Sequence, residues 1–192
     1  MKYFNKIAFG INMLPLAIAL RRQPELWGRY PNRCVGDSPH RETEDIWIRY
    51  ADIRKTIDAV GPIAGESESN KEHHPVWWPA YRLLPQIRPI LFGLMSLVEG
   101  EELGTVILIR VPAGKQIYPH VDDGWSANYY AKYFIAVENQ PGATFNFPDG
   151  ERIAAEPGDV HWFTNRVPHN VTNPTATDQI LLIATIRSDR NE

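Results

Sequence analysis

The distribution of apolar and polar residues divides the chain into two parts. Up to about Glu102, apolar residues at helical spacing alternate with long polar segments. From Thr105 onward the pattern changes to short apolar or alternating runs separated by turn residues. This change predicts an N-terminal part with helices and a few strands, followed by a part that consists of strands.

The first part opens with an apolar run over residues 6–20. Its pattern predicts a strand over about Lys6–Ile11 and then a helix that ends near Leu26. Such a run is also similar to the apolar region of a secretory signal peptide. Because Asn12 interrupts it and no small-x-small cleavage motif follows, we expect it to belong to the folded domain.

Further elements are predicted before the change of pattern. The sequence EDIWIRY predicts a strand whose two faces carry, respectively, Ile46, Ile48 and Tyr50, and Trp47 and Arg49. Residues 79–100 have helical spacing, and Gly100 stands where a helix C-cap is expected. The polar residues 65–74 predict a loop, in which we expect His73 and His74 to be solvated.

Eight runs in the second part are predicted to be strands: residues 105–111, 117–122, 130–139, 143–147, 151–155, 160–164, 169–173 and 179–187. The sequence predicts a hairpin turn at 148–150 (PDG) and a tight turn at 156–159 (EPGD). Eight short antiparallel strands are typical of the double-stranded β-helix, the jelly roll of the cupins. We therefore expect a mainly β fold with flanking helices, as a single domain over residues 1–192, in which residues 1–104 support a jelly-roll core at 105–187.

Composition restricts the possible functions. The 192 residues, of which 11% are aromatic, are enough for one sizeable core. A net charge of -3 gives no electrostatic basis for binding nucleic acid or an anionic membrane, so we expect neither as a partner. The single cysteine, Cys34, excludes an intrachain disulfide, and no nearby residue indicates an activated thiol. This favours a reducing compartment such as the cytoplasm.

Candidate metal ligands lie in the sequence YPHVDDGW, residues 118–125. In a strand, His120 and Asp122 point to the same face and Asp123 points to the other. A third ligand is expected from His169, 49 residues after His120 and at the start of a later strand. Two histidines and one carboxylate form the facial triad of non-haem Fe(II) oxygenases.

The alternative to a metal site is structural: Asp122 would cap a turn, and His169 would be an ordinary loop residue. The His-x-Asp spacing, the strand pattern and the distant histidine coincide, which favours the metal site. We expect Asp123 to support the loop around Trp125, and His161 to pack or to face solvent on a late strand.

Four segments of the second part occur in a fixed order: VPAGKQIYPHVDDG, AKYFIAVENQPG, GDVHWFTNRVPHNV and DQILLIATIR. With them, the sequence resembles the aspartyl/asparaginyl β-hydroxylase type of Fe(II)/2-oxoglutarate-dependent oxygenase, including its small bacterial and phage-type members. The resemblance covers about Thr105–Arg187 and extends more weakly to SPHRETEDIWIRY. It implies Fe(II) held by His120, Asp122 and His169. It also implies 2-oxoglutarate and O2 as cosubstrates, and hydroxylation of a C–H bond coupled to conversion of 2-oxoglutarate to succinate and CO2.

The resemblance is less complete for the cosubstrate. It places Lys132 where the family has a basic residue that contacts a cosubstrate carboxylate; the alternative is a surface lysine. Ten residues after the distal histidine, where the family has an arginine for the far carboxylate, this sequence has Gln179. Arg187 lies about 26 Å further along a strand, at about 3.3 Å per residue, and cannot replace it. Either Lys132 or Arg110 takes over this role, or the cosubstrate differs.

The resemblance implies that the substrate is an amino acid, or an amino-acid side chain of Asp or Asn type in a peptide or protein. Candidate substrate contacts come from the loops that flank the triad and from the weaker resemblance: Trp125, Tyr129, Tyr130, Arg166, His40 and Arg49. Two other classes remain open. A non-catalytic jelly-roll binding module is favoured by Gln179, whereas a cupin metalloenzyme without 2-oxoglutarate is disfavoured because the segment around His120 offers no further histidine.

Overall fold

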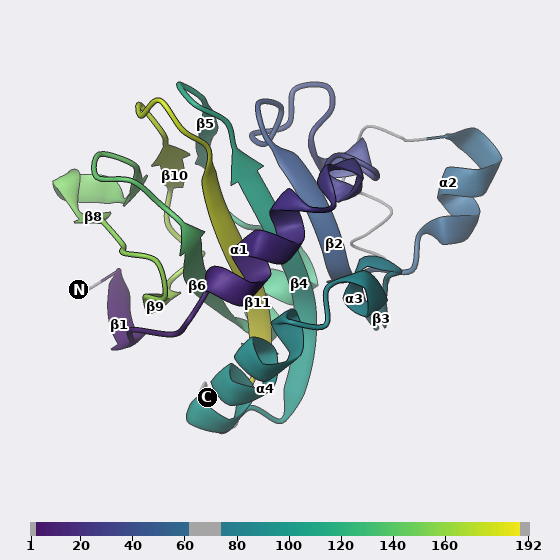
Figure 1. Cartoon of the computed structure of the whole chain (residues 1–192), viewed down its shortest axis with the longest axis horizontal. Coiled ribbons are helices and arrows are strands. Elements are labelled where there is room, and N and C mark those ends of the chain that lie inside the picture. Colours follow the sequence, from purple (N-terminus) through teal and green to yellow (C-terminus); the bar gives the residue numbers. More distant parts are fainter. Residues whose placement is uncertain (1–2, 62–73, 189–192) are drawn as a thin grey trace.

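Two β-sheets face each other in the computed structural model, which describes residues 3–61 and 74–188 (Figure 1). The strands are β1 (Phe4–Ala8), β2 (Glu44–Tyr50), β3 (Val76–Trp77), β4 (Glu102–Val111), β5 (Gln116–His120), β6 (Ala131–Glu138), β7 (Thr144–Asn146), β8 (Arg152–Ile153), β9 (Val160–Phe163), β10 (His169–Thr172) and β11 (Gln179–Arg187). The helices are α1 (Leu14–Arg21), α2 (Arg54–Val60), α3 (Ala80–Leu83), α4 (Ile87–Leu97) and α5 (Gly124–Tyr129). Among these described helices, none has the length and apolar character needed to cross a bilayer.

The strand order is that of a jelly roll. The larger sheet has the order β1-β9-β6-β11-β4-β2-β3 and the smaller one the order β5-β10-β7-β8. The eight strands from β4 to β11 make up two four-stranded halves, and β1, β2 and β3 extend the larger sheet at its edges. The mainly β jelly roll with flanking helices is confirmed, and each of the eight runs expected after Thr105 contains a strand. The hairpin at 148–150 and the tight turn at 156–159 are also present.

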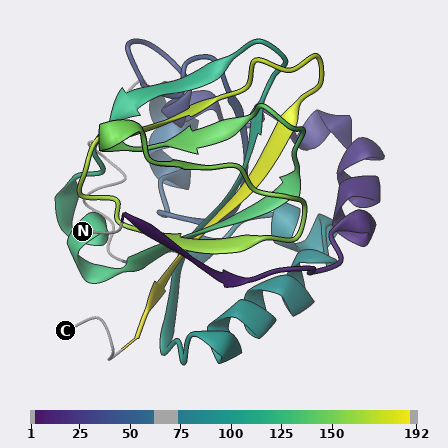
Figure 2. The ribbon, with the colours of Figure 1, turned by 90° about the vertical axis from the view of Figure 1, so that its left-hand side faces the viewer.

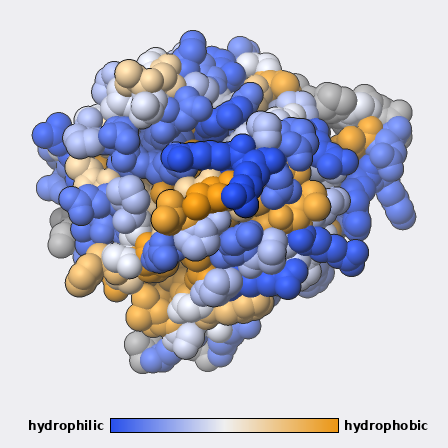
Figure 3. All heavy atoms as spheres, in the orientation of Figure 1, coloured by the Kyte–Doolittle hydropathy of each residue, from blue (hydrophilic) through white to orange (hydrophobic). Residues whose placement is uncertain are grey.

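Two hydrophobic cores follow from the two faces of the larger sheet. The outer face is covered by α1 and α4, which Figure 2 shows on one side of the strands. Its core combines helix residues such as Leu20 of α1 and Leu91 of α4 with sheet residues such as Ile48, Leu108 and Leu182. The inner face packs against the smaller sheet through residues such as Ile109, Phe134, Phe145, Phe163 and Val171. On the helical face, some apolar side chains also reach the surface (Figure 3), among them Leu14, Ile18, Phe92 and Leu97.

Strand β2 departs from the expected alternation. Ile46 and Ile48 lie in the outer core, but Tyr50 lies with Trp47 in the core between the sheets. The pairing of β2 with β4 shifts its register between Trp47 and Arg49, and such an irregularity moves later side chains to the opposite face. The expectation that Tyr50 shares a face with Ile46 and Ile48 was therefore wrong.

Other boundaries differ by a few residues. Strand β1 ends at Ala8, and α1 ends at Arg21, after which a short 3-10 turn reaches Leu26. The predicted loop at 65–74 falls, as far as residue 73, outside the described residues, and with it His73; His74 is exposed.

The C-terminal end of α4 does not use Gly100 as expected. The left-handed residue is Glu99, with φ 52°, and the N–H of Gly100 donates to the carbonyl of Met95 at 2.8 Å. This is the 6→1 bond of a Schellman motif. Glycine is needed for a close approach instead, because a Cβ at this position would lie 2.4 Å from Cγ2 of Ile186.

Candidate active site

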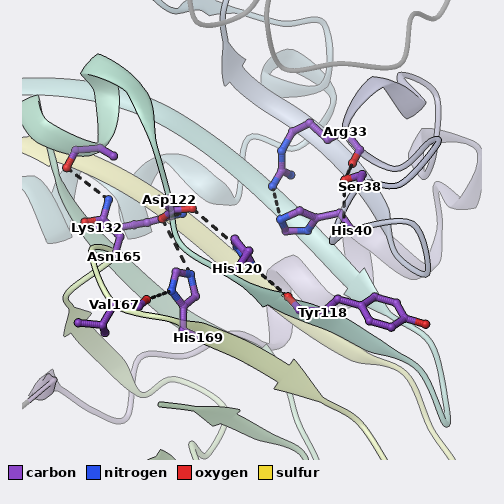
Figure 4. A network of polar contacts seen from close by, with 11 residues as sticks. Arg33, Ser38, His40, Tyr118, His120, Asp122, Lys132, Asn165, Val167 and His169 are labelled. Carbon is purple, nitrogen blue, oxygen red and sulfur yellow. Dashed lines mark hydrogen bonds and ion pairs between the residues drawn. The ribbon is translucent and has the colours of Figure 1, made fainter. Parts of the chain in front are cut away.

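Strand pairing brings the three candidate ligands together. His120 is the last residue of β5 and His169 the first of β10, and the two residues are direct partners in the antiparallel ladder. Asp122 Oδ1 lies 3.7 Å from Nε2 of His120, and its Oδ2 lies 4.0 Å from Nε2 of His169 (Figure 4). One ligand atom from each residue lies within 4.8 Å of the other two.

We expected strand alternation to bring His120 and Asp122 together, but the structure brings them together in another way. Strand β5 ends at His120, so Asp122 lies in the connection to α5. The N–H of Asp122 donates to the carbonyl of Asn165 at 3.1 Å, which fixes this connection against the segment that precedes β10. Asp123 caps α5, a helix that the sequence analysis missed, through an Oδ1 that accepts from Gly124 N–H at 2.6 Å. A capping aspartate directly before the helix was the available signal.

Backbone carbonyls orient both imidazoles. Nδ1 of His120 lies 2.8 Å from the carbonyl of Tyr118, and Nδ1 of His169 lies 2.9 Å from the carbonyl of Val167. Because a carbonyl only accepts, each Nδ1 carries the proton and each Nε2 keeps its lone pair toward Asp122. Hydrogen bonds of this kind, made by the ring nitrogen that does not bind the metal, hold metal-ligating histidines in the tautomer and orientation that metal binding requires.

The protonation states suit a divalent cation. Burial lowers the pKa of His169 to about 4 and also lowers the pKa of His120. Burial acts to raise the pKa of Asp122, but Lys132 and the two histidines outweigh it and leave the pKa below its ordinary value. Two neutral imidazoles and one carboxylate are the forms in which these side chains bind metal, so this donor set fits Fe(II).

Lys132 is part of the site and not a surface lysine. It lies on β6, and its Nζ is 2.5 Å from Oδ2 of Asp122. Only 17% of its side chain is exposed. Its ammonium therefore holds Asp122 in the ionised form.

A cavity of about 340 Å³ adjoins the triad between the two sheets. Two of the six predicted substrate contacts, Trp125 and His40, line it. His40 is buried, and its ring lies 5.3 Å from that of His120. Near α5 the wall also includes Ser126, Thr105 and Thr185.

The other predicted contacts lie elsewhere. Arg49 Nε donates to the carbonyl of Leu103 at 2.9 Å, and the Tyr130 hydroxyl donates to Glu102 at 2.8 Å. Arg166 is exposed on a loop, and the Tyr129 hydroxyl also bonds to Glu102, at 3.2 Å. The structure thus brings none of these four side chains to the cavity wall.

Two of the three predicted cosubstrate residues are also away from the cavity. The guanidinium of Arg110 is paired with Glu44. Gln179 is buried at the start of β11, where it pairs with Val111, and neither residue lines the cavity. Of the three, only Lys132 reaches it.

Arg33 is a charged residue of the cavity wall that the sequence did not predict. It ends the 3-10 turn Pro31–Arg33, and its Nη1 lies 2.5 Å from Oδ2 of Asp45 on β2. No motif marks Arg33 in the sequence. A charged residue inside the apolar strand pattern of β2, Asp45, was the one signal that a buried partner exists.

The structure also agrees with the predictions for Cys34 and His161. Burial raises the pKa of the Cys34 thiol to about 12, which is the opposite of what a nucleophilic thiol requires. His161 is buried and stacks on Phe134, with ring centroids 5.6 Å apart, so it is a packing residue.

Comparisons with known proteins find a similarity of fold only. No family model and no curated protein matches the sequence. A viral collagen prolyl hydroxylase from Paramecium Bursaria Chlorella virus-1, solved with 2-oxoglutarate, matches with a TM-score of 0.54 and 14% identity over 97% of both chains. An oxidoreductase of the 2OG-Fe(II) oxygenase family from Burkholderia pseudomallei matches with a TM-score of 0.50 and 18% identity, over 88% of this chain and 80% of that one. The chain therefore has, over most of its length, a jelly-roll fold like that of known 2-oxoglutarate-Fe(II) oxygenases.

Proposed function

We propose that the protein is an Fe(II)- and 2-oxoglutarate-dependent oxygenase. It would use O2 to hydroxylate an amino acid, or an amino-acid side chain of Asp or Asn type in a peptide or protein. The observation that carries this proposal is the geometry of His120, Asp122 and His169, whose ligand atoms converge beside a cavity inside a jelly roll. Three protein ligands of this kind leave coordination positions open for a cosubstrate and O2.

Each residue of the site has a separate task. The triad would hold the metal, and the carbonyls of Tyr118 and Val167 keep the two imidazoles aligned. Lys132 keeps the carboxylate ligand ionised. The bound iron would supply O2 activation coupled to the oxidative decarboxylation of 2-oxoglutarate.

The size of the cavity supports a small substrate group. About 340 Å³ is at the lower end of the range of ligand pockets, about 300–1,000 Å³. It suits a small dicarboxylate together with one side chain. The wall near α5 combines the aromatic Trp125 with the polar Ser126, Thr105 and Thr185, which suits a short polar side chain rather than a long apolar one.

A second candidate function is a non-catalytic binding module with a retained metal site. It is favoured by Gln179, which replaces the expected arginine and lies outside the cavity. It is opposed by the complete triad and by the charge of Lys132 beside it.

The test is an anaerobic titration of the Fe(II)-loaded protein with 2-oxoglutarate, followed by its visible metal-to-ligand charge-transfer absorption. We expect the band in the wild type and in His161→Phe, a histidine variant outside the site, and its loss in Asp122→Ala and His169→Ala. Iron binding without the band would contradict the cosubstrate assignment and favour the binding module or an oxidase of another type. Where the band forms, succinate release in air with candidate amino acids and peptides identifies the substrate.

A further inference from the structure

In the oxygenase family that the sequence resembles, an arginine that binds the far carboxylate stands at the position of Gln179. Gln179 does not line the cavity and so cannot bind this carboxylate. Along β11, the cavity is lined by Leu181, Ile183 and Thr185, and the lining stops before Gln179. Thr185 pairs with Lys132, so this end of β11 is next to the metal ligands and Leu181 is at the other end, about 13 Å away at about 3.3 Å per residue. The wall around Leu181 is apolar: Leu181 pairs with Ile109 on β4, and Ile117 and Val171, which pair with each other, line the cavity on the smaller sheet.

Arg33, on the 3-10 turn Pro31–Arg33, is held near this apolar end by Asp45 of β2. Strand pairing places Asp45 beside Ile109, and Ile109 beside Leu181, in one row across β2, β4 and β11. Asp45 has no exposed side-chain surface and binds Nη1 of Arg33 at 2.5 Å, and the Arg33 side chain is itself only 11% exposed. The guanidinium is therefore fixed at the end of the cavity that lies away from Lys132, and Arg33 lines that cavity.

His40 adds a second polar group beside this guanidinium. Nη2 of Arg33 lies 2.9 Å from Nε2 of His40. Because a guanidinium only donates, Nε2 accepts and the proton of this imidazole is on Nδ1. That Nδ1 is buried and has no hydrogen-bond partner among the described residues, although His40 lines the cavity. Figure 4 shows His40 between Arg33 and His120.

We propose that Arg33, positioned by Asp45 and assisted by His40, binds the far carboxylate of 2-oxoglutarate in place of the missing β11 arginine. This inference rests on the proposed function. A guanidinium presents several N–H donors in a planar fork, so it can bind Asp45 on one side and a ligand carboxylate on another. Lys132 and Arg33 are the two described lysine or arginine residues on the cavity wall, and Lys132 is engaged with the metal ligand Asp122.

The experiment compares two 2-oxo acids that differ in the far carboxylate. Affinities of 2-oxoglutarate and of 2-oxobutyrate, which has the same metal-binding end but no far carboxylate, are measured by calorimetry on the Mn(II)-loaded protein. The test variant is the double substitution Arg33→Gln with Asp45→Asn, because removing Arg33 alone would leave a buried carboxylate unpaired. Arg110→Gln, which removes an arginine paired outside the cavity, is the matched control.

We expect the double variant to bind 2-oxoglutarate at least about tenfold more weakly and 2-oxobutyrate as tightly as the wild type does, since a charge-assisted hydrogen bond is lost only with the first ligand. Arg110→Gln should change neither affinity. If the double variant does not fold, as judged by circular dichroism, Arg33→Lys replaces it. This variant keeps the charge beside Asp45, loses the fork, and should also weaken only 2-oxoglutarate.

Three results would overturn the inference. The first is unchanged affinity for 2-oxoglutarate, the second is an equal loss for both ligands, which indicates a structural role for Arg33, and the third is a selective loss in Arg110→Gln. A wild-type protein that binds Mn(II) but not 2-oxoglutarate contradicts the proposed function itself. That outcome is distinct from the three above, in which the wild type does bind 2-oxoglutarate.

Discussion

Two buried histidines, His161 and His169, allow the metal site to be tested separately from the rest of the fold. Both are 3% exposed, and burial lowers the pKa of each to about 4. Each ring stacks on a phenylalanine: His161 on Phe134 with centroids 5.6 Å apart, and His169 on Phe145 at 5.5 Å. Substitution by phenylalanine at either position keeps an aromatic ring in the stack and removes the titrating group.

The expected effect follows from proton linkage. An unfolded histidine has a pKa of about 6.5, so as the pH falls the unfolded chain binds a proton before the folded protein does. The metal-free protein therefore loses stability as the pH falls from about 6.5 toward 4. Between pH 7 and pH 5, about 1.5 pH units lie below 6.5, and at about 1.4 kcal/mol per unit each histidine contributes a loss of about 2 kcal/mol. His161→Phe and His169→Phe should each remove about this much of the acid-induced loss.

The assay is urea unfolding in EDTA at pH 7 and pH 5, followed by tryptophan fluorescence. The unfolding is repeated at pH 7 with Mn(II) in place of EDTA. Mn(II) at about 100 times its Kd should stabilise the wild type and His161→Phe by about 2.7 kcal/mol, but not His169→Phe. If His161→Phe loses as much stability in acid as the wild type does, burial does not hold this imidazole neutral. If His169→Phe gains as much from Mn(II) as His161→Phe does, then His169 is not a ligand.

Three shorter predictions concern the scaffold. Gly100→Ala should lower the free energy of unfolding by about 1–3 kcal/mol, because the new Cβ would lie 2.4 Å from Cγ2 of Ile186; urea unfolding at the wild-type value would contradict this close approach. Asp123→Ala removes the cap of α5 and should cost about 1 kcal/mol while Mn(II) binding is retained, which the same assay and calorimetry can check. Native Cys34 should react with iodoacetamide at pH 8 at least about tenfold more slowly than in urea, as measured by mass spectrometry, because burial raises its pKa to about 12; equal rates would show an accessible thiolate.

Much of the jelly roll could be predicted from the sequence because turns and strand patterns are local. The hairpin at 148–150 and the turn at 156–159 separate short strands whose alternation is visible residue by residue. The errors occurred where local alternation fails. A register shift in β2 moves Tyr50 to the core between the two sheets. Strand β5 ends at His120, so Asp122 reaches the site through a connection fixed by Asn165. Neither event follows from the polarity of the residues, because each depends on what the neighbouring strand or loop presents.

The metal ligands could be predicted from the sequence and Arg33 could not, for the same reason. His120 and His169 lie on adjacent strands and pair directly, so a fixed order and spacing along the chain corresponds to one geometry in space, and a motif can record it. The position of Arg33 depends on two successive strand pairings and on a buried carboxylate that holds it. No spacing along the sequence encodes such an arrangement. Asp45, an acidic residue at an interior position of β2, is its only trace, and a buried charge requires a partner. The last strand of this jelly roll lacks the expected cation, and the buried acidic residue on the inner face of β2, a strand added beside β4, therefore indicates where to look for the replacement.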